Sequence, residues 1–221
     1  VGSLITAIIE FGQQTTGMGV CYIELTNVSI TMVANEDAKV VCALFYDRDD
    51  GVLFGRLICG EILTAFTQEY SYDVTQFGKN LKDFYGFQKK ISSIVRFSSK
   101  SVILKLESQK AIKRVLLMNE REIIHTPNDD IDQLSILANL TAFIELCSGI
   151  MSAINDSVQH VTLDTACRHT VHMWRIQEAS VLVVAVDSRV PKEEYFPHIE
   201  EALELIEQVC ILHTTLEQGA R

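Results

Sequence analysis

Residues 38–66 read AKVVCALFYDRDDGVLFGRLICGEILTAF, and residues 179–206 read ASVLVVAVDSRVPKEEYFPHIEEALELI. Each stretch begins with an apolar run that is typical of a strand, turns at an aspartate (Asp47 or Asp187), and continues as a long helix. Each is preceded by further strands and by a long apolar helix. Because this order recurs about 140 residues along the chain, the sequence predicts two copies of one α+β unit.

The composition is that of a folded protein, whose length suits one large domain or two small ones and whose repeated pattern favours two. The chain has 221 residues, of which 48% are hydrophobic and 22% are charged, so it can build a core. No run reaches the roughly 18 apolar residues that a membrane span needs. No basic leader marks a signal peptide, and Val1 falls inside the first predicted helix, so we expect missing N-terminal residues. The six cysteines lie far apart without a Cys-x-x-Cys pair and predict free thiols in a reducing compartment.

Charge is unevenly distributed along the chain. The formal net charge is −10, yet residues 71–125 hold 11 of the 19 lysines and arginines and only 5 of the 29 acids. The acidity of the remainder opposes nucleic acid binding. The basic segment is expected to meet an acidic partner, an anionic membrane surface or the protein's own acidic face.

The first half predicts a helix, an antiparallel three-stranded meander and two further helices. The links between the strands are too short for crossover connections, which gives the meander. Glycines at 17 and 19 end the first helix. The last helix is amphipathic and basic. In order, the predicted elements are Leu4–Thr16, Val20–Leu25, Val28–Ala34, Lys39–Tyr46, Gly51–Tyr70 and Val74–Ser98. A short further helix is expected over Ser99–Lys110, in the segment that links the two halves.

The second half predicts a hairpin, a helix, three strands and a final helix. The helix that follows the hairpin is apolar nearly all round, so we expect it to be buried on more than one side. The middle strand of the three is polar on both faces and is expected near a sheet edge. These elements are Ile112–Met118, Glu122–Thr126, Ile131–Asn155, Val158–Thr165, Arg168–Gln177, Ala179–Asp187 and Glu193–Thr214.

This order of elements resembles the longin and roadblock superfamily of small α/β domains. The resemblance implies an α+β fold of two units, each an antiparallel five-stranded sheet packed with helices, the first without its leading hairpin. Residues 1–98 would form the first unit with its basic helix, residues 99–111 a linker, and residues 112–221 the second unit. GAF and profilin-like sheets share related orders.

Chemistry-bearing motifs are scarce. The sequence contains no Gly-x-x-x-x-Gly-Lys-Ser/Thr, Gly-x-Gly-x-x-Gly or Gly-x-Ser-x-Gly pattern. Cys167, His169 and His172 form a compact group, but on a strand His172 points away from the other two, so we interpret them as ordinary strand residues and not as zinc ligands or a nucleophile pair. Asp47, Asp49 and Asp50 are interpreted as a helix cap. We therefore predict no catalytic residue, metal or cofactor.

The resemblance implies a non-catalytic scaffold or adaptor subunit. Such a subunit pairs with another longin-type domain or a second copy and regulates or recruits a small GTPase of the Rab, Arf or Rag type. It would act in membrane trafficking or lysosomal signalling, in the cytoplasm or peripherally on endomembranes. Three interaction surfaces are predicted: the first helix, a sheet edge and the basic helix, through Leu4, Ile8, Phe11, His172, Trp174, Lys82, Lys89 and Lys90.

Two alternatives to the adaptor remain open. A GAF-like small-molecule sensor would use polar residues that point inward from the strands, such as His172 and Arg175. A hydrolase with a dispersed site is the other alternative.

Overall fold

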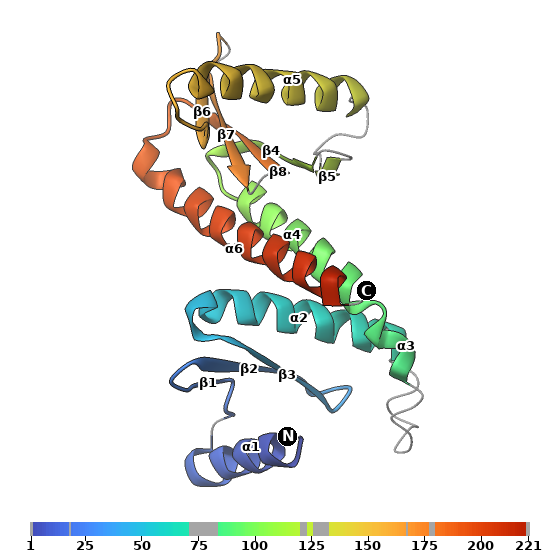
Figure 1. The fold of residues 1–221 in the computed structure, drawn as a ribbon. Coiled ribbons are helices and arrows are strands. Elements are labelled where there is room, and N and C mark those ends of the chain that lie inside the picture. The colour runs from blue at the N-terminus through green and yellow to red at the C-terminus, as the bar shows by residue number, and fades with distance from the viewer. Residues whose placement is uncertain are drawn as a thin grey trace. The chain divides into compact units, whose positions relative to one another are not determined.

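The chain folds as an α+β protein with two sheets. The computed structural model describes residues 2–17, 19–70, 84–119, 123–125, 133–166, 168–176 and 180–219 (Figure 1). Two compact units are present: Val1–Ser98 with Gln208–Arg221, and Ser99–Glu207. That they are copies of one ancestral domain stays a prediction.

The first unit is a three-stranded sheet between two helices. It contains α1 (Gly2–Thr16), β1 (Tyr22–Glu24), β2 (Val28–Asn35), β3 (Val40–Asp47), a short 3-10 turn (Arg48–Asp50) and α2 (Gly51–Tyr70). The strands are antiparallel in the order β1-β2-β3, with Val28 opposite Asp47 and Asn35 opposite Val40. The predicted meander is therefore confirmed. Helix α1 ends where Gly17, at φ +70°, donates its N–H to the carbonyl of Gln13 at 3.0 Å.

Helices α1 and α2 cover opposite faces of this sheet (Figure 1). On the α1 face, Ile5 packs with Ile30 and Met32 of β2. On the α2 face, Gly55 is buried directly beneath the ring of Tyr46. The hydroxyl of Tyr46 lies 2.8 Å from Thr31 Oγ1, so both polar groups are satisfied next to the core.

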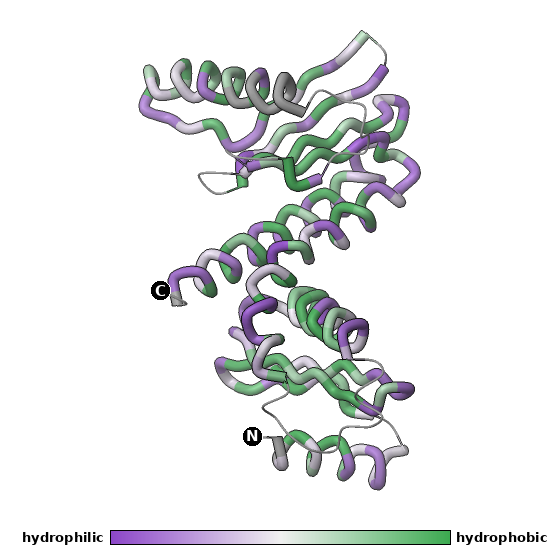
Figure 2. The backbone as a smooth tube through the Cα atoms, turned by 90° about the vertical axis from the view of Figure 1, so that its right-hand side faces the viewer, coloured by the Kyte–Doolittle hydropathy of each residue, from purple (hydrophilic) through white to green (hydrophobic). Residues whose placement is uncertain are grey.

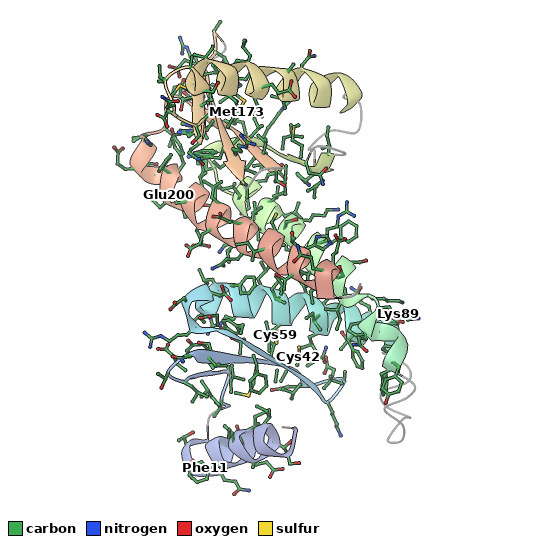
Figure 3. All side chains as sticks on the ribbon, in the orientation of Figure 1. Phe11, Cys42, Cys59, Lys89, Met173 and Glu200 are labelled. Atoms are coloured by element: carbon green, nitrogen blue, oxygen red, sulfur yellow. The ribbon has the colours of Figure 1, made fainter. Side chains whose placement is uncertain are left out.

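Cys59 on α2 anchors that helix to the sheet. Its side chain is 0% exposed, and its Sγ donates to the carbonyl oxygen of Cys42 at 3.2 Å (Figure 3). The thiol contact with Cys59 and burial raise the pKa of Cys42. None of the cysteines in the described ranges forms a disulfide.

The predicted single helix over residues 74–98 is wrong in its described part. Residues 71–83 lie outside the described ranges. A short α3 (Tyr85–Gln88) is followed by a turn and then by α4 (Ile91–Glu107), which runs through residues 99–107 of the predicted linker. The helix continues past Ser98 because Ser98 and Ser99 are buried within an apolar stripe that extends to Val102 and Leu106.

The second unit contains the predicted five-stranded antiparallel sheet. Its strand order is β5-β4-β8-β7-β6. The elements are β4 (Ile112–Asn119), β5 (Ile123–His125), α5 (Gln133–Ser152), β6 (His160–Asp164), β7 (His169–Ile176), β8 (Ser180–Asp187) and α6 (Lys192–Gly219). The leading hairpin and the three later strands are confirmed.

The core of the second unit lies between this sheet and the helices α4 and α6. Leu117, Leu182 and Val184 of the sheet are fully buried, as are Ile103 of α4 and Ile199 of α6. Hydrophobic residues follow the central strands of this sheet (Figure 2). Burial of each such side chain stabilises the fold by about 1.5–3 kcal/mol, so this layer holds the unit together. None of the helices in the described ranges is long and apolar enough to cross a membrane.

Two expectations for this unit need correction. Strand β7 lies near the sheet edge as expected, but it is not the edge strand itself, because β6 pairs with it along its outer side. Helix α5 lies over one face of the sheet (Figure 1) and leaves Leu146 and Ile150 exposed. An apolar pattern all round a helix does not reveal which side is covered.

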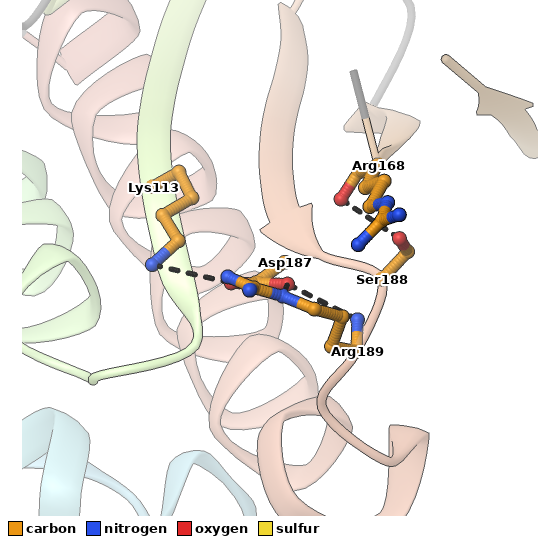
Figure 4. A network of polar contacts seen from close by, with 5 residues as sticks. All are labelled: Lys113, Arg168, Asp187, Ser188 and Arg189. Carbon is orange, nitrogen blue, oxygen red and sulfur yellow. Dashed lines mark hydrogen bonds and ion pairs between the residues drawn. The ribbon is translucent and has the colours of Figure 1, made fainter. Parts of the chain in front are cut away.

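The two aspartate corners share one local geometry. Asp47 Oδ1 accepts the backbone N–H of Asp49 at 3.1 Å, and Asp187 Oδ1 accepts the N–H of Arg189 at 3.1 Å. Asp187 also binds the Arg189 guanidinium, with Oδ2 at 2.7 Å from Nη2, and lies 3.6 Å from Lys113 Nζ (Figure 4). The side-chain and backbone hydrogen bonds from Arg189 hold the pKa of Asp187 well below its usual range.

Candidate interaction surfaces

The first predicted surface, on α1, is divided between two sides of the helix. Ile5 faces the sheet and Ile9 packs against the same cluster, while Ile8 is half-buried. Phe11 is 69% exposed and projects from α1 (Figure 3). The side chain of Leu4 lies outside what the structure describes. Phe11 is therefore an apolar group on the outside of this unit that a partner can cover.

The positive charge of the second predicted surface, the basic segment, is partly neutralised by an acidic residue of the same unit. Lys82 lies outside the described residues. Lys89 is exposed at the end of α3 (Figure 3). Lys90 is also exposed, but its Nζ lies 2.8 Å from Glu69 Oε1 at the end of α2. At this position the basic segment meets the protein's own acidic residue, one of the three outcomes that its charge predicted.

Aromatic residues of the same segment dock onto α2. The Phe84 and Phe87 rings lie 5.3 Å and 5.1 Å from the Phe66 ring, and Phe84 also meets Tyr70 at 5.0 Å. Edge-to-face and tilted contacts of this kind stabilise packing. Docking on a neighbouring surface is therefore the role of these two rings, in preference to stacking on nucleic acid bases.

The third predicted surface, around His172 and Trp174, is an aromatic cluster on the α6 face of the second sheet. His160 of β6 stacks on Trp174 with ring centroids 4.4 Å apart and planes 5° apart. His160 Nε2 lies 3.1 Å from His172 Nδ1, and His172 Nε2 lies 3.3 Å from the Tyr195 hydroxyl of α6. The cluster joins β6, β7 and α6 through a continuous polar chain.

Electrostatics keep these histidines neutral. His172 is 4% exposed, and burial, with the nearby positive charges of His160 and Lys192, lowers the pKa of His172 to about 4. Burial and Lys192 also lower the pKa of His160. Lys192 Nζ itself sits 3.8 Å from the centre of the Phe196 ring. At neutral pH the cluster is therefore an uncharged packing unit, and His172 is not an exposed edge residue.

A cavity of about 570 Å³ borders this cluster. Trp174, Arg175 and Ile176 of β7 form one wall, with Gln159 beside β6 and with Leu203 and Glu207 from α6. The mixture of an indole face, a guanidinium and a carboxylate suits a small polar ligand with an apolar part. Of the two predicted sensor residues, Arg175 lines the cavity and His172 does not.

The described residues give no support for a metal site at the compact group of Cys167, His169 and His172. Cys167 lies outside the described residues, and the β7 register places His169 opposite Asp187 and His172 opposite Val184, on alternate faces. Among the described residues no group of three or more histidine, cysteine, aspartate or glutamate side chains is placed to hold a metal ion.

Sequence reasoning missed two features. One is the His160–Trp174 stack, which depends on a register that pairs residues of two strands. The other is the pair of exposed apolar side chains on β3, Val41 and Phe45. The apolar run over Val40–Tyr46 predicts a strand, but only the sheet order shows that, among the described strands, β3 is at the end of its sheet.

The described residues thus define an α+β protein with a three-stranded and a five-stranded antiparallel sheet. No family model matches the sequence, and no curated protein matches it. Over about half its length the chain is similar in fold to solved structures of MglB.

Myxococcus xanthus MglB gives a TM-score of 0.48 at 18% identity, covering 53% of this chain and 91% of that one. Gliding protein MglB from Thermus thermophilus gives 0.43 at 11%, covering 50% and 87%. MglB in a tetrameric arrangement gives 0.46 at 10%, covering 54% and 92%. At these identities the likeness concerns the fold alone.

Proposed function

We propose that this chain is a non-catalytic adaptor subunit that pairs with another longin-type domain or a second copy. The combined surface would recruit or regulate a small GTPase of the Rab, Arf or Rag type, in membrane trafficking or lysosomal signalling. The order of elements in both units supports the family to which this role belongs.

Exposed apolar side chains on secondary structure carry the proposal. In the first unit they include Phe11 on α1 with Val41 and Phe45 on β3, and in the second they include Leu146 and Ile150 on α5. Single exposed apolar residues are ordinary on a protein surface, but grouped ones mark sites of association. These groups suit contact with other proteins.

The basic segment offers positively charged side chains that an acidic partner or anionic lipids could bind. Lys89 is exposed, and Lys90 forms a solvent-exposed ion pair with Glu69, of the kind that contributes little to stability. An acidic partner can therefore displace Glu69 at little cost.

Binding to a panel of purified GTPases, each loaded with GDP or a non-hydrolysable GTP analogue, tests the proposal. Retention of one GTPase by the wild-type chain is expected, with weaker retention by Phe11→Asp and by Lys82→Glu/Lys89→Glu/Lys90→Glu. Lys110→Glu, also exposed but near the start of β4, is the matched charge control. Retention of no GTPase in either nucleotide state would rule the adaptor role out.

The cavity beside Trp174 favours a second candidate, a small-molecule sensor. Trp174 is the single tryptophan of the chain and lines the cavity, so its fluorescence reports occupancy. Native mass spectrometry of protein purified without denaturation would show a bound small molecule, and Arg175→Ala would release it. A chain that purifies empty and whose fluorescence responds to no metabolite fraction would exclude the sensor.

A further inference from the structure

Strand β6 is held to its sheet mainly by polar contacts. Among the described strands it ends the order β5-β4-β8-β7-β6, and of its five residues only Val161 is even half-buried. On the face that contacts α6, the register pairs three residues of β6 with three of β7: His160 with Trp174, Thr162 with His172, and Asp164 with Thr170. Because opposite residues in an antiparallel pair share a face, this side of β6 contributes no aliphatic side chain to the core.

The two histidines of this face meet nitrogen to nitrogen. His160 Nε2 lies 3.1 Å from His172 Nδ1, the two ring planes differ by 17°, and the ring centroids are 5.3 Å apart. A contact this short at that centroid separation requires the rings to lie edge to edge, so that the two nitrogens point toward each other. Thr162 Oγ1 lies 3.3 Å from each of the same nitrogens. The side chains of β6 therefore join the sheet through this one imidazole pair.

The pair can accommodate one added proton but not two. In a neutral imidazole one ring nitrogen donates and the other accepts, whereas both donate in the protonated form. When one of the two histidines is protonated, the other can still accept its N–H. When both are protonated, N–H faces N–H across the 3.1 Å contact, and two positive charges repel each other at short range. The second proton therefore breaks the contact.

The charges around the pair also oppose a second proton. Burial and then Lys192 of α6 lower the pKa of His160, and burial, His160 and Lys192 lower the pKa of His172. Asp164 of β6 raises the pKa of His172, but by less than these causes lower it. Glu193, in the first turn of α6, acts on the Tyr195 hydroxyl. The remaining neighbours are uncharged: Thr162, Thr170, Trp174, Val184, Tyr195 and Phe196.

We propose that the His160–His172 contact is an acid-sensitive switch, which holds β6 on the sheet while at most one of the two imidazoles is protonated and releases β6 when both are. His160, which is exposed, takes the first proton and donates its Nε2–H to His172 Nδ1. His172, which is buried, takes the second proton as the strand opens. The switch would operate whether or not the chain binds a GTPase or a small molecule.

The direction of the pH effect follows from the two states. In the open state both imidazoles face water and bind protons near their ordinary pKa of about 6.5. The closed state does not accept the second proton until the pH approaches the pKa of His172, about 4. Opening therefore takes up about one proton between these limits, and the opening equilibrium should rise up to about tenfold for each pH unit of acidification.

Hydrogen exchange of the full chain, followed by mass spectrometry, measures this opening. Protection factors, in which the intrinsic effect of pH on exchange is divided out, report the opening equilibrium of each strand. Amides of residues 160–164 are expected to lose up to about tenfold protection per pH unit below about pH 6.5, and to be less protected than those of β8 at every pH. Constant protection of β6, or protection equal to that of β8 throughout, would overturn the proposal.

His160→Gln separates the imidazole pair from the burial of His172. The glutamine amide can turn its oxygen toward Nδ1 and accept the N–H of a protonated His172, so the total acid-dependent loss of protection at β6 should be at least about tenfold smaller than in the wild type. His169→Gln removes a histidine from the other face of β7; as the matched control it should behave as the wild type. A loss in His160→Gln as large as that of the wild type would overturn the proposal.

An NMR titration of the histidine ring nitrogens counts the protons in the unsubstituted chain. His160 is expected to titrate first, and His172 is expected to stay neutral until the β6 amides lose their protection. Protonation of both histidines while β6 remains protected would show that the pair tolerates two protons, and the switch would then be refuted.

Discussion

Gly55 and Gly60 lie on the same helix, α2, yet alanine should have opposite effects at the two positions. A Cβ at Gly55 would overlap the ring and hydroxyl of Tyr46, whereas a Cβ at Gly60 meets nothing within 4 Å. In a helix interior, alanine is favoured over glycine by about 1 kcal/mol. Gly60→Ala should therefore stabilise the first unit by about 0.5–1 kcal/mol.

At Gly55 the clash outweighs the gain in helix propensity. Overpacking of a filled core costs about 1–3 kcal/mol, and moving the Tyr46 ring also breaks its contact with Thr31, at about 1 kcal/mol. The net expectation for Gly55→Ala is a loss of about 1–3 kcal/mol, so the two alanine variants should differ by about 1.5–4 kcal/mol.

Thermal unfolding followed by circular dichroism measures the difference, and hydrogen exchange of β2 and β3 amides localises it to the first unit. Tyr46→Leu in the Gly55→Ala background removes the obstructing ring, so the two changes should couple in a double-mutant cycle. Equal stability of the two alanine variants, or no coupling to Tyr46, would refute the packing of α2 on β3.

Three further predictions concern single residues. Because burial lowers the pKa of His172 from 6.5 to about 4, His172 takes up a proton in the unfolded chain at a higher pH than in the folded one, and the second unit should lose up to about 3 kcal/mol of stability between pH 6.5 and 4. Urea unfolding followed by Trp174 fluorescence should show that the stability of His172→Phe depends less on pH than that of the wild type. An unchanged pH dependence would contradict this prediction. Asp187→Asn should lower the midpoint of thermal unfolding at pH 7 and reduce the loss of stability in acid, because a carboxyl group whose pKa is lowered by folding stabilises the folded state above its unfolded pKa. A midpoint equal to that of the wild type would show that the contacts of Asp187 with Arg189 and Lys113 do not stabilise the unit. Gly17→Ala should destabilise α1 by about 1 kcal/mol because its φ of +70° suits glycine, while Gly19→Ala, with open space around it, should be neutral; circular dichroism melts compare the two.

Local signals in the sequence were sufficient for most elements. The β-branched runs over β2, β3 and β8 and the turns at Asp47 and Asp187 depend on neighbours within a few residues, and these elements lie where they were predicted. The sequence predicted a break between Ser98 and Ser99, with a separate short helix after it. Helix α4 instead runs through both serines, because they are buried and continue its apolar stripe.

The sites depended on contacts that no local pattern contains. Whether β7 is an edge is decided by β6, which pairs with it, and whether His160 meets Trp174 is decided by their register. The exposed stripe of α5 was missed for a related reason, because an apolar helix carries no mark of the side that its sheet will cover. Of the eight predicted interface residues, the structure shows Phe11 and Lys89 exposed, Lys90 paired with Glu69, and His172 inside the cluster.

The buried thiol of Cys59 can be used to measure how often α2 separates from the sheet of the first unit. An alkylating reagent can reach this sulfur only when α2 separates from β3, whereas the exposed Cys21 reacts at once and serves as the internal reference. The ratio of the two labelling rates would give the opening equilibrium of the helix without any added probe.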